Sequence, residues 1–261
     1  MEKIAIIKIG GNIIDNEVHL ASFLSTYATI QGKKILIHGG GKLATKMAAD
    51  LDIPQQMVDG RRITDAATLK IVTMVYAGYI NKNIVAALQS KKVNALGICG
   101  ADGNIIKAHK RINAGTDYGF VGDIDLVDIE KIVQLLDAGL SLVVAPITHD
   151  GAGQLLNTNA DTMAQAIATA LSHVYEVSLV YSFEKKGVLS DIHNNESVIP
   201  VIHPQNYGSL KASGQVNEGM IPKLDNAFEA LQKGVSRVII GDALDIDELI
   251  VGKAGTTIQK K

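Results

Sequence analysis

The sequence has no tryptophan, only four phenylalanines and a single cysteine, Cys99, among its 261 residues. One cysteine excludes an intramolecular disulfide and any metal site built from several cysteines. Such sparse use of cysteine is typical of a reducing compartment, so we expect a cytoplasmic protein. Because large aromatic side chains are scarce, the core must consist of Ile, Leu, Val and Ala, as is usual for parallel sheets covered by helices on both faces.

A strong net charge and a long apolar segment are also missing. The formal net charge is −2, which offers no electrostatic reason to expect nucleic acid or an anionic membrane as a partner. We find no run of about 18 apolar residues that could span a bilayer. The apolar run at residues 4–9 is short and interrupted by Lys8, unlike a secretory signal.

Short apolar runs alternate with segments of helical periodicity along the chain. This alternation predicts an α/β fold in which parallel strands are joined by crossover helices. Two polar, glycine-containing segments, residues 102–123 and 185–200, are predicted as β-hairpins. The expected strands are residues 3–9, 34–38, 93–98, 140–146, 174–181 and 236–240, and the expected helices are residues 17–30, 41–51, 65–90, 127–138, 159–172, 203–211 and 220–233.

Two of the predicted strands end abruptly at consecutive glycines. The first leads into Gly10 and Gly11, and the second leads into glycines 39–41. Glycines at the carboxyl end of a buried strand leave backbone N–H groups open to an anion. Each set alone could be a tight strand-to-helix turn, but together they indicate a phosphate-handling site.

Lys8 strengthens this interpretation. Strand alternation places Ile7 and Ile9 on one face and Lys8 on the other. A lysine within a buried strand needs an anionic partner, because an unpaired ammonium is costly there. The alternative is an edge strand with a solvated lysine.

Two common nucleotide motifs fit poorly. Residues 38–44 can be aligned with the dinucleotide fingerprint G-x-G-x-x-A, but they would close the second strand instead of the first. The acidic residue expected about 20 positions later is absent from a strand end, since Asp59 and Asp65 lie in a turn before a helix. The Walker pattern G-x-x-x-x-G-K-[ST] occurs nowhere.

Three further positions carry weaker signals. One of the adjacent Arg61 and Arg62 could hold a carboxylate bidentately, although paired loop arginines are more often surface residues. Asn159 as an N-cap with Asp161 in the first turn has a complete structural explanation. Lys223 in the first turn of a helix opposes the helix dipole, and a bound phosphate would remove this conflict.

Taken in order, these motifs resemble the amino acid kinase family over essentially the whole chain. The resemblance is greatest to members that use ATP to phosphorylate the γ-carboxylate of N-acetyl-L-glutamate in arginine biosynthesis. It implies a three-layer αβα sandwich with an open, mainly parallel sheet. It also implies two lobes, residues 1–173 for the acyl amino acid and dimerisation, and residues 174–261 for the nucleotide. The motifs are Lys8-x-Gly10-Gly11, His38-Gly39-Gly40-Gly41, Gly60-x-Arg62-x-Thr64, Asn157-x-Asn159-Ala160-Asp161 and Gly219-Met220-x-x-Lys223.

The resemblance implies roles for individual residues. Lys8 and Lys223 would flank the transferring phosphoryl group as catalytic residues, and Asp161 would hold both lysines. The implied substrate-binding residues are Gly40, Gly41, Arg62, Asn157 and Asn159, and the implied nucleotide-binding residues are Gly10, Gly11, Gly187, Leu189 and Gly219.

The residue inventory agrees with this chemistry. A side-chain carboxylate with a reference pKa of about 4.3 is ionised at neutral pH, so the acceptor needs no general base. What the reaction needs is neutralisation of charge between two anions that are held in line. We expect Mg²⁺ to arrive with ATP, and we assign no protein ligand to it.

One segment departs from the family's pattern. Residues 181–189, at the expected nucleotide loop, are longer than usual, and the family's aspartate is missing. The chain also begins at its first strand, without the N-terminal helix of arginine-inhibited hexamers, so we expect a homodimer that is insensitive to arginine. The acyl group could be succinyl instead of acetyl.

Other functions on the same fold remain open at this stage. They include a carbamate, uridylate, glutamate or aspartate kinase, and a ligand sensor or storage protein that has lost catalysis. The presence of Lys8, Lys223 and Asp161 argues against the loss of catalysis.

Overall fold

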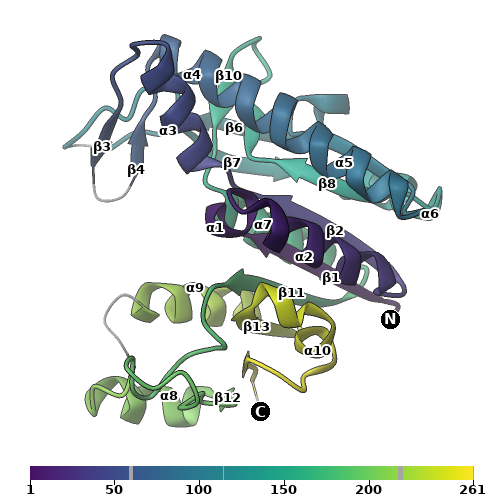
Figure 1. Cartoon of the computed structure of the whole chain (residues 1–261), viewed down its shortest axis with the longest axis vertical. Helices are drawn as coiled ribbons and strands as arrows, with labels where there is room; N and C mark the ends of the chain where they lie inside the picture. Colours follow the sequence, from purple (N-terminus) through teal and green to yellow (C-terminus); the bar gives the residue numbers. More distant parts are fainter. Residues whose placement is uncertain (59–60, 114, 217–219, 261) are drawn as a thin grey trace.

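The fold is built around one twisted, eight-stranded sheet (Figure 1). The computed structural model describes residues 1–58, 61–113, 115–216 and 220–260. The sheet order is β12-β14-β13-β11-β1-β2-β8-β5, and neighbouring strands are parallel except for the pair β13 and β14. The strands are β1 (Lys3–Ile9), β2 (Lys33–His38), β5 (Ala95–Cys99), β8 (Ser141–Ala145), β11 (Glu176–Phe183), β12 (Val201–Ile202), β13 (Arg237–Asp242) and β14 (Thr256–Ile258).

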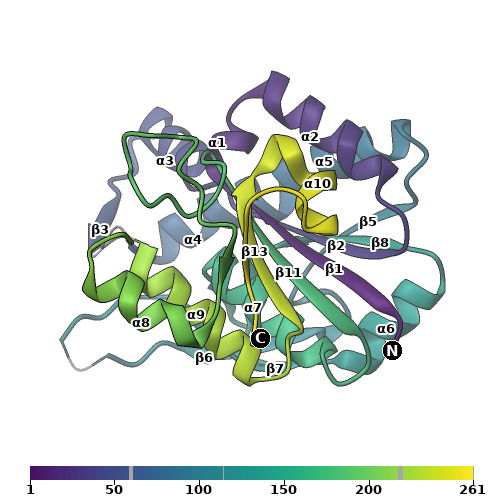
Figure 2. The same cartoon turned by 90° about the horizontal axis from the view of Figure 1, so that it is seen from below.

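Helices cover both faces of this sheet and complete three layers (Figures 1 and 2). Alternate residues of β1 point to opposite faces: Ile4 and Ile6 belong to one core cluster, and Ile7 and Ile9 belong to the other. The first cluster packs under α6 (Ile129–Asp137), α7 (Ala160–Leu171), α8 (Pro204–Ala212) and α9 (Ile221–Gln232); the second packs under α1 (Gly11–Ile14), α2 (Glu17–Thr29), α3 (Gly41–Asp50), the helix from Ala66 to Ser90, and α10 (Ile246–Val251).

The predicted αβα architecture is therefore confirmed. Outside the two predicted hairpins, every strand and helix expected from the sequence is present, and the ends differ by no more than two residues. The strands before residue 173 occupy one half of the main sheet, and those after it occupy the other half, with β1 and β11 paired where the halves meet.

The long helix from Ala66 to Ser90 consists of α4 (Ala66–Thr73), a π-helical turn, η1 (Met74–Ile80), and α5 (Asn81–Ser90). By length and composition this segment could cross a membrane, a property that we did not expect from the sequence. The core helix of a globular protein passes the same test, and Val72 and Ile84 of this helix are fully buried against the sheet.

Two smaller sheets lie beside the main one. The predicted hairpin at residues 102–123 is present as the antiparallel pair β6 and β7 of a four-stranded sheet, but its second strand, residues 122–127, lies mostly beyond the predicted end. The predicted hairpin at residues 185–200 is reduced to a single antiparallel bridge, between Leu189 and Val198. Polar side chains such as Asp191 bond to nearby backbone N–H groups there and compete with a strand ladder. The smaller sheets contain β3 (Gln56–Val58), β4 (Arg61–Ile63), β6 (Ile106–Lys110), β7 (Gly122–Val127), β9 (Ile147–His149) and β10 (Leu155–Asn157).

Candidate active site

The two glycine-ended strands lie side by side. Strands β1 and β2 are parallel neighbours with Ile9 opposite His38, and the Gly39 N–H donates to the Ile9 carbonyl over 3.2 Å. Helices α1 and α3 begin directly after these strands, at Gly11 and Gly41. Their free N–H groups therefore open at the same edge of the sheet, where an anion can be bound.

Lys8 is buried and paired. It lies on the central strand β1 and is 8% exposed, so the alternative of a solvated edge lysine is wrong. Its Nζ is 2.8 Å from Oδ1 of Asp161, in the first turn of α7. Asn159 is the N-cap of α7, as predicted, and accepts hydrogen bonds from the backbone N–H groups of Asp161 and Thr162.

Lys223 approaches the same cluster from α9. Its Nζ lies 3.8 Å from the centroid of the Phe183 ring, and Lys8 Nζ lies 5.8 Å from the same ring. Burial lowers the pKa of Lys223; the Asp161 carboxylate raises it and the Lys8 ammonium lowers it further. The fold thus gathers two lysines and one aspartate that are far apart in the sequence.

A first hollow, the inner cavity, opens beside Lys8 and has a volume of about 260 Å³. It lies between the glycine turns, the β3–β4 hairpin and the start of α7. Its lining includes every residue that we predicted to bind the substrate: Gly40, Gly41, Arg62, Asn157 and Asn159.

Arg62 is held in place within this wall. Its Nη2 donates to the Gly41 carbonyl over 2.9 Å and to Thr45 Oγ1 over 2.8 Å, and its Nη1 donates to Gln55. Asn157 donates to Oγ1 of the buried Thr64 over 3.0 Å. Both side chains are pre-oriented by the protein, so little entropy is lost when a ligand binds.

Gly40 meets two separate constraints. Its φ of 152° is disfavoured for residues with a side chain, and an added Cβ would lie 2.4 Å from Ile80 and 3.0 Å from Tyr76. Both neighbours lie on the π-helical turn η1. The π turn therefore presses directly on the glycine loop, and such turns are frequent at functional sites.

His38 supports the loop from behind. Its ring is fully buried, with Nδ1 2.8 Å from the Gly39 carbonyl and Nε2 3.2 Å from the amide nitrogen of Asn81. Burial lowers the pKa of His38 to about 4. The ring is therefore neutral at pH 7, with Nδ1 donating to Gly39 and Nε2 accepting from Asn81.

A second hollow, the outer cavity, has a volume of about 360 Å³, and Lys223 is one of its lining residues. Gly187 and Leu189 line it, as expected for nucleotide-binding residues, together with Phe183 and Ile192. An added Cβ on Gly187 would lie 2.8 Å from Oγ1 of Thr256, so this glycine also permits close packing. Gly219, the remaining nucleotide-binding prediction, lies outside the described residues.

A third hollow, the middle cavity, shares lining residues with both of the others: Gly41 with the inner cavity and Glu184 with the outer cavity. Gly10, Gly11, Lys42 and Phe183 are among its lining residues, and its volume is about 260 Å³. Lys42 was given no role from the sequence, although it directly follows the second glycine set. Its Nζ donates to the side chain of Asn12, which places an exposed cation beside the first glycine turn.

Arg111 is a second residue that the sequence did not single out. It lines the inner cavity and binds the Asp123 carboxylate, with Nε 3.1 Å from each oxygen and Nη2 2.5 Å from Oδ1. This contact raises the pKa of Arg111. No local pattern marks Arg111, because its position depends on the β6–β7 register.

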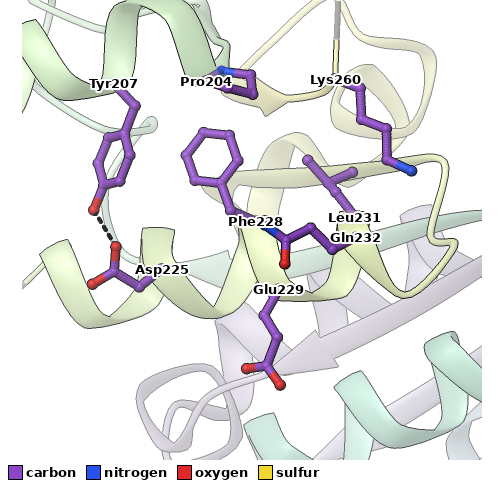
Figure 3. A pocket seen from close by; sticks show the side chains of 8 residues that line it. All are labelled: Pro204, Tyr207, Asp225, Phe228, Glu229, Leu231, Gln232 and Lys260. Atoms are coloured by element: carbon purple, nitrogen blue, oxygen red, sulfur yellow. Dashed lines mark hydrogen bonds between the residues drawn. The ribbon is translucent and has the colours of Figure 1, made fainter.

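Another hollow lies away from this cluster, between α8, α9 and the C-terminal residues (Figure 3). Tyr207 donates to Asp225 over 2.7 Å at its rim, and Phe228 forms part of its wall. None of the predicted site residues that the structure describes lines it. Within the ranges that the structure describes, no three His, Cys, Asp or Glu side chains are grouped to hold a metal ion.

Comparison with known proteins identifies the class. The model of the amino acid kinase family matches residues 3–242, and the chain belongs to this family. It is 57% identical over 251 residues to the acetylglutamate kinase of Cytophaga hutchinsonii. This match covers 96% of the present chain and 95% of that relative. It is 36% identical over 258 residues to the acetylglutamate kinase of Methanopyrus kandleri, with 97% and 99% covered.

Solved structures share the fold. The protein smu.665 of Streptococcus mutans UA159 superimposes with a TM-score of 0.78 at 25% identity, covering 99% of each chain. The N-acetylglutamate synthase of Neisseria gonorrhoeae, in complex with coenzyme A and N-acetyl-glutamate, gives a TM-score of 0.82 at 23% identity. The present chain is covered completely in that match but spans 60% of the synthase.

Proposed function

We propose that this protein transfers the γ-phosphoryl group of ATP to the γ-carboxylate of N-acetyl-L-glutamate. The product is N-acetyl-L-glutamyl 5-phosphate, an intermediate of arginine biosynthesis. The observation that carries the proposal is the pairing of Lys8 with Asp161 at 2.8 Å, with Lys223 nearby; Lys8 lines the inner cavity and Lys223 lines the outer cavity. The full-length relatives named acetylglutamate kinase support the choice of substrate.

The inner cavity is the proposed acylglutamate site. Arg62 offers a charged donor to the substrate's α-carboxylate, and Asn157 and Asn159 line the same cavity. Gly40 and Gly41 admit the acyl group and carboxylate close to the backbone, since no side chain stands in the way. This arrangement leaves the γ-carboxylate facing Lys8.

The outer and middle cavities are the proposed nucleotide site. Gly187 and Leu189 contact the adenosine end, and the N–H groups at Gly10 and Gly11 face the phosphates. Gly219 is assigned to the same site on the motif alone. Mg²⁺ enters with ATP and is held by phosphate oxygens and water.

The transfer is a direct displacement. An oxygen of the ionised γ-carboxylate attacks the γ-phosphorus, the bond to the bridging oxygen of ADP breaks, and no proton needs to be removed from the nucleophile. Lys8 and Lys223 neutralise the charge that spreads over the phosphoryl oxygens, and Asp161 orients Lys8 for that task. Holding both anions in line supplies the rest of the acceleration.

We extend the proposal to the two lobes, the cellular compartment and the oligomeric state. Residues 1–173 form the acylglutamate lobe with the dimer contact, and residues 174–261 form the nucleotide lobe. The protein acts as a cytoplasmic homodimer. Light scattering of the purified protein tests the dimer, and a monomer or hexamer would contradict it.

Trapping of the acyl phosphate with hydroxylamine tests the reaction. The protein is incubated with ATP and, separately, N-acetylglutamate, N-succinylglutamate, glutamate, aspartate and carbamate. We expect hydroxamate with N-acetylglutamate. Product only with N-succinylglutamate would keep the chemistry and change the acyl group, whereas no product with either acylglutamate would refute the proposal.

The lysines provide the mechanistic test. Lys8→Ala and Lys223→Ala should each lower kcat by roughly 100-fold or more, because each removes a charge contact made in the transition state. Lys233→Ala is the control, since Lys233 lies at the far end of the same helix α9 in an exposed pair with Glu229. A change confined to KM for ATP would show that the two lysines only bind the nucleotide.

A further inference from the structure

Phe183 occupies a distinctive position in the proposed active site. It is the last residue of β11, two positions after Tyr181, so the two rings lie on the same face of the sheet. Tyr181 is the register partner of Lys8 on β1. The ring of Phe183 therefore lies on the same face as the Lys8 ammonium, at the carboxyl edge of the sheet.

The Phe183 ring contacts both lysines. Its centroid is 3.8 Å from Nζ of Lys223 and 5.8 Å from Nζ of Lys8, within the range of a cation–π interaction. The ring stacks on Tyr181 with centroids 6.5 Å apart, and the Tyr181 hydroxyl donates to the Asp161 carbonyl over 3.4 Å. The aromatic pair is thus anchored to the helix that supplies the carboxylate.

The charges around the ring are unequal. Asp161 lies 2.8 Å from Lys8 and partners that lysine. Lys223 makes no ion pair within 4.0 Å among the residues described, and Lys8 is a like charge nearby. The negative face of an aromatic ring attracts an ammonium without adding a carboxylate that would repel phosphates.

Phe183 also lies between two cavities. It lines the outer cavity together with Lys223, and it lines the middle cavity together with Gly10 and Gly11. An ammonium held on the face of the Phe183 ring therefore lies between the two cavities of the proposed nucleotide site, where we place the terminal phosphates of ATP.

We propose that Phe183 is a positioning residue that holds the ammonium of Lys223 on its ring face, beside Lys8 and Asp161, ready for the phosphates of ATP. This inference rests on the proposed kinase function. Its competitor is a purely apolar role, in which the ring only forms a wall of the outer cavity and any apolar side chain would serve.

Two substitutions separate these roles. Phe183→Leu keeps an apolar side chain but removes the π face, and Phe183→Tyr keeps the ring. We expect Phe183→Leu to lower kcat by about tenfold, a loss between those of an exposed and of a fully desolvated cation–π interaction. Phe183→Tyr should retain a kcat within about twofold of the unchanged protein. If the ring were only an apolar wall, Phe183→Leu would leave kcat unchanged, because leucine would serve as well as phenylalanine.

A second readout does not depend on turnover. The rate at which acetic anhydride modifies Lys223 is followed against pH by mass spectrometry on the unliganded protein. Among the residues that the structure describes, the charged groups around Lys223 are Asp161 on α7, Lys8 on β1, and Glu184 and Lys185 of the outer cavity. Because the ring favours the ammonium, Phe183→Leu should lower the pKa of Lys223, and Phe183→Tyr should preserve it.

Ile192→Ala is the matched control, because Ile192 lines the same outer cavity and is 51% exposed. It should leave the pKa of Lys223 unchanged. An unaltered Lys223 titration in Phe183→Leu, or equal behaviour of the Leu and Tyr variants, would overturn the proposal. If the protein produced no acyl phosphate, the titration would still test the placement of Lys223, so failure of the kinase function is distinguishable.

Discussion

Lys8 and Asp161 form an ion pair of unequal exposure: Nζ and Oδ1 are 2.8 Å apart, the lysine side chain is 10% exposed, and the aspartate side chain is 40% exposed. Removing the carboxylate would leave a nearly buried ammonium without its partner. The loss of stability would therefore come mainly from the desolvated Lys8 ammonium. Solvent reaches Asp161 and weakens the attraction between the two charges.

Asp161→Asn is therefore expected to lower the free energy of unfolding by about 2 kcal/mol and to reduce kcat. Lys8→Met combined with Asp161→Asn should recover part of the lost stability, because no charge is then left unpaired. Urea unfolding of the single and double variants measures this coupling. Strictly additive losses would show that the pair does not stabilise the fold.

Arg62 should govern affinity for the acylglutamate. Arg62→Ala is expected to raise KM for this substrate by about 100-fold with little change in kcat, since a charged contact to the α-carboxylate is lost in ground and transition states alike. Arg61→Ala is the neighbouring comparison, because Arg61 lines the same cavity. Steady-state kinetics measure KM for the acylglutamate in both variants. A larger increase in KM for Arg61→Ala would show that Arg61, and not Arg62, binds the α-carboxylate.

Lys42 should contribute to binding of the nucleotide phosphates. Lys42→Met is expected to raise KM for ATP by about threefold to tenfold, more at low salt than at high salt, because the cation is exposed and screened. Lys46→Met, one turn further along α3, is the control and should have no such effect. Equal salt dependence of the two variants would remove Lys42 from the site.

Gly40 should be irreplaceable for backbone reasons. Gly40→Ala is expected to destabilise the protein by about 2 kcal/mol or more, because the added Cβ would lie 2.4 Å from Ile80. Gly78→Ala on η1 has open space around its Cβ and should stabilise the protein by up to about 1 kcal/mol. Thermal unfolding measures both, and equal melting temperatures would contradict the expectation.

His38 should make stability depend on pH. Its pKa is about 4 in the folded state and about 6.5 when unfolded. Above about pH 6.5 the His38 ring is neutral in both the folded and the unfolded state, so the free energy of unfolding carries no penalty from His38. As the pH falls toward 4, the unfolded state takes up a proton that the folded state refuses, so stability falls by up to about 3 kcal/mol.

His38→Gln removes this titration and is the test. The free energy of unfolding is measured in urea at pH 7 and at pH 4.5 for both proteins. Between these two pH values it should fall more for the unchanged protein than for the variant. An identical pH slope in both proteins would show that His38 does not titrate in this way.

The sequence predicted the strands and helices of the main sheet well, because their apolar periodicity is local. It also predicted Asn159 as an N-cap and an anionic partner for the buried Lys8. It overestimated the strands in residues 185–200, where turn-forming polar side chains outweigh a strand pattern and one antiparallel bridge forms. It did not indicate Lys42, Arg111 or the π turn, whose significance arises from contacts across long stretches of chain.

The residue pattern alone determined the α/β class, the glycine-ended strands and the family. These follow from periodicity, from backbone chemistry at glycine and from the order of the motifs. The tertiary structure decided which side of the sheet Lys8 faces, that Asp161 reaches it, and that Phe183 lies against both lysines. Such contacts depend on strand order and register, which bring residues 8, 161, 183 and 223 to one edge of the sheet.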